Sequence, residues 1–583
     1  MSTSAPRKRI PYGIMDFTRM LGDNCYYVDK TRFIEEIEQA NSFFFYIRPR
    51  RFGKSLTLSM LRHYYDVKEA DRFKDWYEGL YIYSHPTPER GKYLVIYLNF
   101  ALVNAELGSY QQALDAHCSL RFNSFCDVYA DLLPEGTKEE MNQLKGAVAQ
   151  LDYLCEACFK KGLWIYLFID EYDHFTNKIL SNPETLEAYK SETHGTGYLR
   201  LFFDTIKGGT DRSIRRCFIT GVSPVTLDDV TSGFNIGTNY SLSLQFNEMI
   251  GFTQKEVRDM LDYYATTCEF HHTTEELINL MKPWYDNYCF AKQAYGRTTM
   301  YNSCMVLYFV DNYIRNGGRL PDTMLEDNVR IDYEKLRMLI RKDKEFVHDA
   351  SIIQTLAEQG YVTGQLKSGF PAEKVTSPDC FISLLFYFGM LTISGSELME
   401  TRFTIPNQVV REQLFNYLLD TYDEIDLTYS KNEKYRLDVA LATRGEWQPY
   451  FGYIAECLSR FASQRDRQKG EAFVHGFSLA MTAQNPFYRP VSEMDTQSGY
   501  ADLFLHPLKE IYKEMQHSYV IELKYAKGRE PIERVEQLRQ EAIKQALRYA
   551  ATDTVQQAIG HTTLHRIVVV FHGMDMAVCE EID

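Results

Sequence analysis

The 583-residue sequence predicts an α/β protein built from three consecutive segments. Short apolar runs alternate with helical periodicity over the first 248 residues, a pattern that indicates a mostly parallel sheet covered by helices. Helical periodicity dominates residues 249–462 and predicts an all-helical or winged-helix-like region. Strand patterns return from residue 463 onward, so we expect domains at 1–248, 249–462 and 463–583.

The expected elements follow from short apolar runs and from apolar spacing of three to four residues. In the first domain, strands are expected at residues 42–47, 93–99, 164–169 and 216–220. Helices are expected from Ser55 to Tyr65, at 141–160 and at 186–206. In the last domain, strands are expected at 500–505, 518–524 and 566–571, with a helix at 531–551.

The composition excludes some classes of protein. A net charge of −15 argues against a general nucleic-acid coat, although a local basic groove remains compatible with it. No apolar run approaches the length of a membrane span, and the first residues lack the apolar stretch of a signal peptide. We therefore expect a cytoplasmic protein with no membrane partner. Cys155 and Cys158 form a lone C-x-x-C without a second ligand pair, which does not predict a zinc site.

The stretch "RPRRFGKSLT" begins at residue 48 and partly matches the phosphate-binding pattern G-x-x-x-x-G-K-[ST]. Gly53, Lys54 and Ser55 fit that pattern, whereas Arg48 replaces its first glycine. A helix that begins here offers unpaired N–H groups and a partial positive charge to phosphate. Lys54 can reach the β- and γ-phosphates of ATP, and the Ser55 hydroxyl can bind Mg²⁺. A basic turn that matches by accident is the alternative.

A second pattern favours the nucleotide site. The apolar run "YLFID" ends in Asp170, which would hold Mg²⁺, and is followed by Glu171, which would act as the general base toward water. The run at 216–220 ends in Thr220, a suitable position for a sensor of the γ-phosphate. The alternative is a strand end that simply meets solvent.

At this point the sequence resembles the AAA-ATPase-like family of P-loop NTPases. The resemblance rests on "YYVDKTRFIE", "IRPRRFGKSLTLSML", "FIDEYD", "FITGVSP" and "GFTQKEV", and it covers roughly residues 8–250. In that family R-P-R-R-F-G-K-S is the ordinary form of the loop. The resemblance therefore implies nucleotide binding by the whole loop: Arg48, Pro49, Arg50, Arg51, Phe52, Gly53, Lys54, Ser55 and Leu56.

A separate set of residues predicts metal chemistry in the last domain. Glu522 and Lys524 lie two apart near the end of an apolar strand, so both face one side of the sheet. Asp502 is expected on the neighbouring strand of a hairpin. Paired carboxylates suit Mg²⁺, and the lysine could orient or deprotonate the water that attacks a phosphodiester. Glu471 on the preceding helix and Gln545 on the following helix could complete the set.

This order of elements resembles the PD-(D/E)xK nuclease superfamily. With the ATPase resemblance it implies an ATPase whose nucleotide state controls a Mg²⁺-dependent nuclease acting on DNA, in defence against foreign or mobile DNA in a prokaryote. The alternative is a nucleotide-dependent switch or binding protein with a catalytically inert nuclease fold. Arg212, Arg215 and Arg216 precede the Thr220 strand and are interpreted as a solvated face, with arginine fingers as the alternative. A homo-oligomer remains open.

Overall fold

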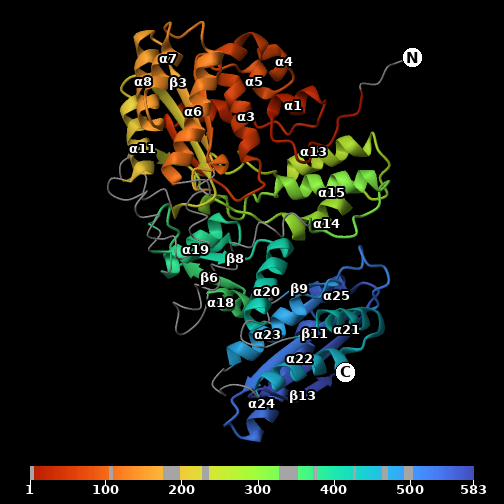
Figure 1. Cartoon of the computed structure of the whole chain (residues 1–583). Helices are drawn as coiled ribbons and strands as arrows, with labels where there is room; N and C mark the ends of the chain where they lie inside the picture. Colours follow the sequence, from red (N-terminus) through yellow and green to blue (C-terminus); the bar gives the residue numbers. More distant parts are fainter. Residues whose placement is uncertain are drawn as a thin grey trace, which may run out of the picture. The chain divides into compact units, whose positions relative to one another are not determined.

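The computed structural model describes residues 6–103, 109–174, 197–225, 236–326, 352–371, 374–375, 377–423, 429–462, 471–491 and 503–583 (Figure 1). The chain forms two compact units. Unit 1 contains Met1–Met338 and Thr363–Pro406, and unit 2 contains Leu339–Val362 and Asn407–Asp583. This division differs from the expected limits at 248 and 462, because residues 249–462 are shared between the two units.

The sheet of unit 1 contains the four expected strands and a short fifth one. The strands are β1 (Phe43–Ile47), β2 (Leu94–Asn99), β3 (Ile165–Asp170), β4 (Ile214–Gly221) and β5 (Thr238–Asn239). They pair in parallel in the order β2-β3-β4-β1-β5. Every residue of β3 is buried, as expected for a central parallel strand covered on both faces. The parallel sheet predicted for the first domain is confirmed.

Helices cover this sheet and connect its strands. They are α1 (Phe17–Gly22), α2 (Phe33–Gln39), α3 (Lys54–Tyr65), α4 (Phe73–Tyr77), α5 (Tyr81–Ser84), α6 (Tyr110–Val128), α7 (Thr137–Gln143), α8 (Ala147–Lys160) and α11 (Tyr198–Gly209). The helix expected at 141–160 is in fact two helices, because the chain turns at Gly146 with φ 87°. Residues 186–196 of the other expected helix lie outside the described residues.

Unit 1 continues into helices and a small antiparallel hairpin. The elements are α13 (Gln254–Ala265), α14 (Thr274–Tyr285), α15 (Ser303–Arg315), α19 (Pro378–Tyr387), β7 (Thr392–Glu397) and β8 (Glu400–Thr404). Together with β6 (Tyr361–Gly364) the hairpin makes a sheet in the order β6-β8-β7. Reciprocal capping hydrogen bonds begin α13 at Thr253 and α14 at Thr273. The helical character expected for the middle region is therefore present.

Unit 2 is a mixed sheet covered by helices. Its helices are α18 (Ile352–Gln359), α20 (Gln408–Asp423), α21 (Lys431–Arg444), α22 (Trp447–Ala462), α23 (Glu471–Ala483), α24 (Ile532–Ala550) and α25 (Asp553–Ile559). Its strands are β9 (Tyr488–Val491), β10 (Leu503–Pro507), β11 (His517–Ala526), β12 (Thr563–His572) and β13 (Asp575–Glu581). They are ordered β13-β12-β11-β10-β9, and only β11 and β12 pair in parallel. The edge strands β9 and β13 were not expected.

The two faces of β11 pack against different helices. Val520 belongs to a core with Val535, Ala542 and Ala546 of α24. The adjacent Tyr519 instead donates its hydroxyl to Leu441 O of α21 at 2.8 Å. Because successive strand residues face opposite sides, α24 and α21 cover opposite faces of the sheet. No helix in the described part of the chain is both long enough and apolar enough to cross a membrane.

Candidate functional site

The loop between β1 and α3 turns sharply into the N-terminus of a helix. Gly53 has φ 106° and is the residue from which α3 begins, a backbone conformation that glycine adopts without strain. Arg51 also has a positive φ, 66°, which a non-glycine residue rarely adopts. The first backbone N–H groups of this 12-residue helix point out of its N-terminus, where they can bind an anion.

Ser55 of α3 and Asp170 at the end of β3 are brought into contact. The Ser55 hydroxyl donates to Asp170 Oδ2 at 2.8 Å, and the Tyr97 hydroxyl donates to the same oxygen at 3.3 Å. Asp170 is fully buried, and burial raises the pKa of its carboxyl, to which the charge of neighbouring Glu171 adds. Hydroxyl and carboxylate oxygens are the donors that Mg²⁺ prefers, so this pair fits the metal expected here.

Lys54 is buried at the entrance of the loop. Its ammonium donates to the Arg48 and Pro49 carbonyl oxygens, each at 3.0 Å. Burial lowers the pKa of Lys54, while the charges of Glu171 and Asp170 act in the opposite direction. The Lys54 ammonium thus donates to two carbonyls of its own loop.

Glu171 follows the end of β3 in a strained backbone conformation. Its φ is 52°, which costs a non-glycine residue roughly 1–3 kcal/mol, and its side chain is half-buried. The Glu171 N–H donates to Asp170 Oδ1 at 3.0 Å. Such strain is commonly kept at functional sites, where it fixes the direction of a side chain.

The Arg48 side chain is buried beside β1 and the segment that follows β5. Its guanidinium donates to Ser241 O at 2.6 Å and to Ile47 O at 3.0 Å. It also stacks on the rings of Tyr46 and Phe290, at 4.3 and 4.2 Å from their centroids. The sequence predicts that Arg48 takes part in nucleotide binding as a residue of the loop; here its planar cation is buried and anchors the start of the loop.

Other loop residues are held by the helical region and the hairpin of unit 1. Arg51 forms an ion pair with Glu326 at 3.0 Å, and its carbonyl accepts from Ser303 Oγ and Cys304 N at the start of α15. Phe52 packs edge-on against Tyr288, with ring centroids 4.9 Å apart. A Cβ added to Gly389 would lie 2.9 Å from Pro49 side-chain atoms. Arg50 and Leu56 are half-buried.

Thr220 and Asp173 fix the ends of neighbouring strands. The buried Thr220 hydroxyl donates to Tyr46 O of β1 at 2.7 Å, so the hydroxyl proton is used in a hydrogen bond between β4 and β1. The Asp173 carboxylate accepts from Val222 N at 3.1 Å and from Ser223 N at 2.5 Å. Sequence reasoning did not find this role of Asp173, although the residue lies within the quoted segment "FIDEYD".

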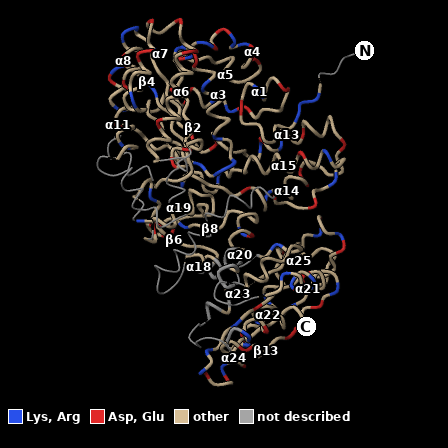
Figure 2. Tube along the Cα trace, in the orientation of Figure 1, with Lys and Arg blue, Asp and Glu red and all other residues tan. Residues whose placement is uncertain are grey.

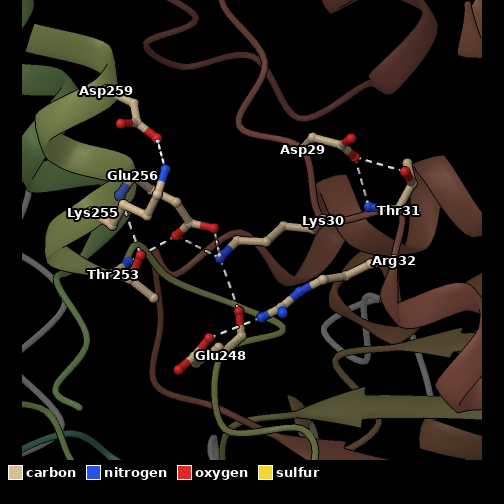
Figure 3. A network of polar contacts seen from close by, with 9 residues as sticks. All are labelled: Asp29, Lys30, Thr31, Arg32, Glu248, Thr253, Lys255, Glu256 and Asp259. Carbon is tan, nitrogen blue, oxygen red and sulfur yellow. Dashed lines mark hydrogen bonds and ion pairs between the residues drawn. The ribbon is translucent and has the colours of Figure 1, made fainter. Parts of the chain in front are cut away.

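The segments "YYVDKT" and "GFTQKEV" meet in one polar network (Figure 3). Lys30 Nζ donates to both carboxylate oxygens of Glu256, at 2.6 and 2.7 Å, and to Glu248 O at 2.9 Å. Glu256 also accepts from Thr253 N as part of the cap of α13. These contacts join two segments more than 200 residues apart and attach α13 to the N-terminal part of unit 1.

The three arginines at the start of β4 and just before it only partly form the solvated face expected from the sequence. Arg216 is buried and forms a two-point ion pair with Glu89. Arg212 pairs with Asp152, and the guanidinium of Arg215 lies 3.8 Å from the centre of the Trp164 ring. Of the three side chains Arg215 is the exposed one, so the interpretation is wrong for Arg216. Long-range partners, which the local sequence does not reveal, account for the difference.

In unit 2, Glu522 and Lys524 lie on the same face of β11, as the period of a strand requires. Lys524 Nζ is 3.3 Å from Glu522 Oε2, and the Glu522 side chain is fully buried. This face packs on α24, where burial raises the pKa of Tyr549 to about 12 and the charge of Glu522 adds to the effect. Gln545 lies one turn earlier on α24, and its buried Oε1 has no hydrogen-bond partner among the described residues.

Two predicted ligands of this centre cannot be placed. Asp502 lies outside the described residues, and Glu471 is described only as the first residue of α23, without its side chain. Within the described residues, no group of three or more His, Cys, Asp or Glu side chains converges as a metal site would require. The carboxylate of Glu522 is an oxygen donor of the kind that Mg²⁺ prefers.

Comparison with known proteins adds two family matches. Residues 11–231 match the family described as Predicted AAA-ATPase, and residues 469–581 match the PD-(D/E)XK nuclease superfamily. A curated relative, described as an uncharacterized protein in the vnfD 5' region of Azotobacter chroococcum mcd 1, is 25% identical over 252 residues. That alignment covers 43% of this chain and 44% of the relative, so it spans less than half of either protein.

Solved structures give weaker similarities. A Cdc6p structure from Pyrobaculum aerophilum has a TM-score of 0.26 and 12% identity, covering 71% of this chain and 97% of that one. The Aeropyrum pernix ORC2 protein in ADPNP-ADP complexes has a TM-score of 0.29 and 11% identity, covering 73% and 98%. Similarities at these TM-scores support no inference. On the family matches, the chain joins an AAA-ATPase-like P-loop domain to a domain of the PD-(D/E)XK nuclease superfamily.

Proposed function

We propose that unit 1 binds ATP together with Mg²⁺ and hydrolyses it, and that unit 2 is a Mg²⁺-dependent nuclease acting on DNA. The observation that carries the first part is the 2.8 Å hydrogen bond from Ser55 to Asp170, with Lys54 buried beside it. The Ser55 hydroxyl of α3 thereby contacts the Asp170 carboxylate at the end of β3. Magnesium coordination in P-loop NTPases requires a hydroxyl and a carboxylate placed in this way.

Each residue of the first site has a role that its position supports. Lys54 would exchange its two loop carbonyls for phosphate oxygens, and the N–H groups at the start of α3 would donate to the same phosphates. Glu171 would accept the proton of the attacking water. Asp170 and Ser55 would hold Mg²⁺, which when bound neutralises the phosphate charge.

The second site would cleave a phosphodiester. Glu522 would bind Mg²⁺ together with Asp502 and Glu471, the two ligands expected from the sequence. Mg²⁺ when bound would stabilise the developing charge and lower the pKa of water. Lys524, 3.3 Å from Glu522, would orient that water and help to remove its proton. The pairing of an ATPase with a nuclease suits defence against foreign or mobile DNA.

Coupling between the two sites is the third part of the proposal. The loop that would hold ATP is fixed by Ser303, Glu326 and Gly389 of the same unit. From that unit the chain passes into unit 2 after residues 338 and 406, and it returns after residue 362. Nucleotide can shift the activity of unit 2 if it binds one arrangement of these segments better than another. A coupling of about 1–3 kcal/mol would change activity about 5- to 150-fold.

The decisive experiment compares DNA cleavage by the wild type and by Glu171→Gln, each without nucleotide, with ADP and with ATP. Coupling predicts that the cleavage rate differs among these six conditions. Because Glu171→Gln binds ATP without hydrolysing it, its cleavage rate with ATP should remain at the value of the ATP-bound state. Equal rates in all six would show two independent enzymes on one chain. ATP binding without cleavage in any condition would instead support the alternative, a nucleotide-dependent switch with an inert nuclease fold.

A further inference from the structure

A short chain of hydrogen bonds leads from β2 to the Asp170 carboxylate. The Asn99 side-chain amide donates to the Tyr97 hydroxyl at 3.4 Å, and that hydroxyl donates to Asp170 Oδ2 at 3.3 Å. In the register of β2 and β3, Asn99 lies beside Asp170 and Tyr97 lies beside Phe168. Because side chains alternate between the two faces of a strand, Tyr97 and Asn99 share one face of the sheet with Asp170.

Asn99 fixes the direction of this chain. Its Oδ1 accepts from the Ala101 N–H at 2.9 Å and begins the 3-10 turn Phe100–Leu102, so the amide nitrogen is the group that faces Tyr97. Because an amide nitrogen can only donate, the Tyr97 oxygen accepts from Asn99 and its own proton is left for Asp170. Burial raises the pKa of the Tyr97 phenol, and the charge of Asp170 adds to the effect, so the hydroxyl keeps its proton at neutral pH.

Helix α3 holds the Tyr97 ring in place. The Arg62 guanidinium lies 4.1 Å from the centre of that ring, a cation–π contact. Arg62 follows Ser55 by seven residues, so two helical turns bring both side chains to the same side of α3. The helix therefore acts on Asp170 by two routes, directly through Ser55 and indirectly through Tyr97. Basic and acidic residues are interspersed along the described trace of unit 1 (Figure 2), so these neighbours act on the carboxylate without a large region of one charge.

The two hydroxyls that reach Asp170 Oδ2 have different tasks. Ser55 is a metal ligand in the proposed function, so its oxygen and that of Asp170 would turn toward Mg²⁺, whereas the Tyr97 hydrogen bond can remain on the other lone pair of Oδ2. Hydrogen bonds to a ligating carboxylate orient it, and their loss typically costs roughly 10- to 100-fold in metal affinity. We infer that Tyr97 is a positioning residue for metal binding by Asp170, and that Asn99 and Arg62 in turn hold Tyr97. This inference rests on the ATPase part of the proposed function.

The test measures how Mg²⁺ strengthens the binding of a fluorescent ATP analogue to the full chain. Tyr97→Phe keeps the ring and removes the hydroxyl. Its nucleotide affinity in EDTA should equal that of the wild type, whereas the Mg²⁺ concentration that gives half of the affinity gain should rise about 10- to 100-fold. Arg62→Gln removes the cation–π contact and leaves the hydroxyl, so it should raise the same concentration by only about two- to fivefold.

Tyr153→Phe is the matched control. The Tyr153 hydroxyl of α8 also donates to a carboxylate, that of Glu140 on α7 at 2.6 Å, and neither residue belongs to the candidate site. The control should therefore leave the Mg²⁺ dependence unchanged. ATP turnover gives a second measurement: saturating Mg²⁺ should bring kcat of Tyr97→Phe back to the wild-type value, while the Mg²⁺ concentration for half-maximal turnover stays raised.

The binding measurements also separate positioning from a purely structural role. A structural role would lower the thermal midpoint of Tyr97→Phe and its nucleotide affinity in EDTA, with no change in the Mg²⁺ concentration for half of the affinity gain, and this result would overturn the inference. Equal Mg²⁺ dependence of the wild type and Tyr97→Phe at equal stability would overturn it as well, while leaving the ATPase proposal intact. Absence of nucleotide binding by the wild type would refute the ATPase proposal and, with it, the inference.

Discussion

The candidate sites of the two units both place a buried carboxylate on a central strand, but they balance its charge in different ways. Asp170 accepts hydrogen bonds from Ser55 at the start of α3 and from Tyr97 of β2. Glu522 has its cation, Lys524, two residues away on the same strand. A contact between separate elements depends on their relative placement, whereas a pair on one strand forms with the strand. We therefore expect the geometry of the first site to change when its elements move relative to one another. The geometry of the second site should persist as long as β11 is folded.

The largest effect should come from Glu522→Gln, which keeps the shape of the side chain and removes its charge. Mg²⁺-dependent nicking of supercoiled plasmid should fall by about 10³-fold or more, because the metal loses a ligand and Lys524 loses its partner. ATP turnover should not change if the second site forms within β11 independently of the first site. Glu533→Gln, an exposed acid of α24, serves as the control. Undiminished nicking by Glu522→Gln would place the cleavage chemistry elsewhere.

Glu171→Gln should reduce ATP turnover by about 10²- to 10⁴-fold, since the general base is lost while the loop and Lys54 remain. Nucleotide affinity, measured by calorimetry with Mg²⁺, should stay within a few-fold of the wild type. A loss of affinity as large as the loss of turnover would instead indicate that the strained Glu171 backbone shapes the binding site.

Lys54→Ala should weaken ATP binding about 10- to 150-fold, which corresponds to a charge-assisted hydrogen bond of about 1.5–3 kcal/mol. Equilibrium titration with a fluorescent nucleotide measures this change. Lys145→Ala removes an exposed lysine of the same unit and should have no effect. Equal affinity of the Lys54→Ala and Lys145→Ala variants would exclude Lys54 from phosphate binding.

Gly221→Ala tests whether the first site depends on packing between elements. A Cβ at this position would lie 2.3 Å from Asp173 Oδ1 and 2.6 Å from the Tyr172 ring, so both side chains must move. We expect a loss of about 1–3 kcal/mol in the free energy of unfolding, together with slower ATP turnover. Gly22→Ala, where a Cβ meets nothing within 4 Å, is the matched control. A variant as active and stable as the wild type would contradict this dependence.

The smallest effect concerns pH. Burial and Glu171 raise the pKa of Asp170 in the folded state, so the folded protein binds this proton more tightly than the unfolded chain does. The contribution of Asp170 to the free energy of unfolding is therefore fully present below the pKa of the unfolded chain, about 3.9. It is lost as the pH rises through the pKa of the folded protein. The thermal midpoint of Asp170→Asn minus that of the wild type should grow from about pH 4 toward neutral pH. Asp204→Asn, an exposed acid, should show no such trend.

The strands around the nucleotide loop could be predicted because each is a continuous apolar run, such as "YLFID". The edge strands β9 and β13 were not predicted because their sequences resemble loops. The sequence of β9, "YRPV", contains a proline and an arginine, and that of β13, "DMAVCEE", contains three acidic residues. Local pattern also suffices for the Glu522–Lys524 pair, whose contact follows from strand periodicity alone.

Long-range contacts set the limits of prediction in the candidate site. The burial of Arg48 depends on Ser241 and Phe290, each about 200 residues or more along the chain. Arg216 likewise meets Glu89 from a segment 127 residues earlier. A basic side chain in a polar stretch gives no local sign of such partners, so the sequence does not predict the burial of either guanidinium. Asp173 was missed for the same reason, since its role exists only once β4 lies beside it.

The passage of the chain between units after residues 338, 362 and 406 has a consequence for how the protein is made and dissected. During synthesis, Leu339–Val362 emerges before the last segment of unit 1, and it must wait for residues beyond 406 before its own unit can form. Folding cannot then proceed one unit after the other in sequence order. For the same reason no single cut separates the chain into two complete halves. An isolated ATPase fragment that ends at residue 338 would lack Gly389 beside Pro49 and would present an altered phosphate-binding loop.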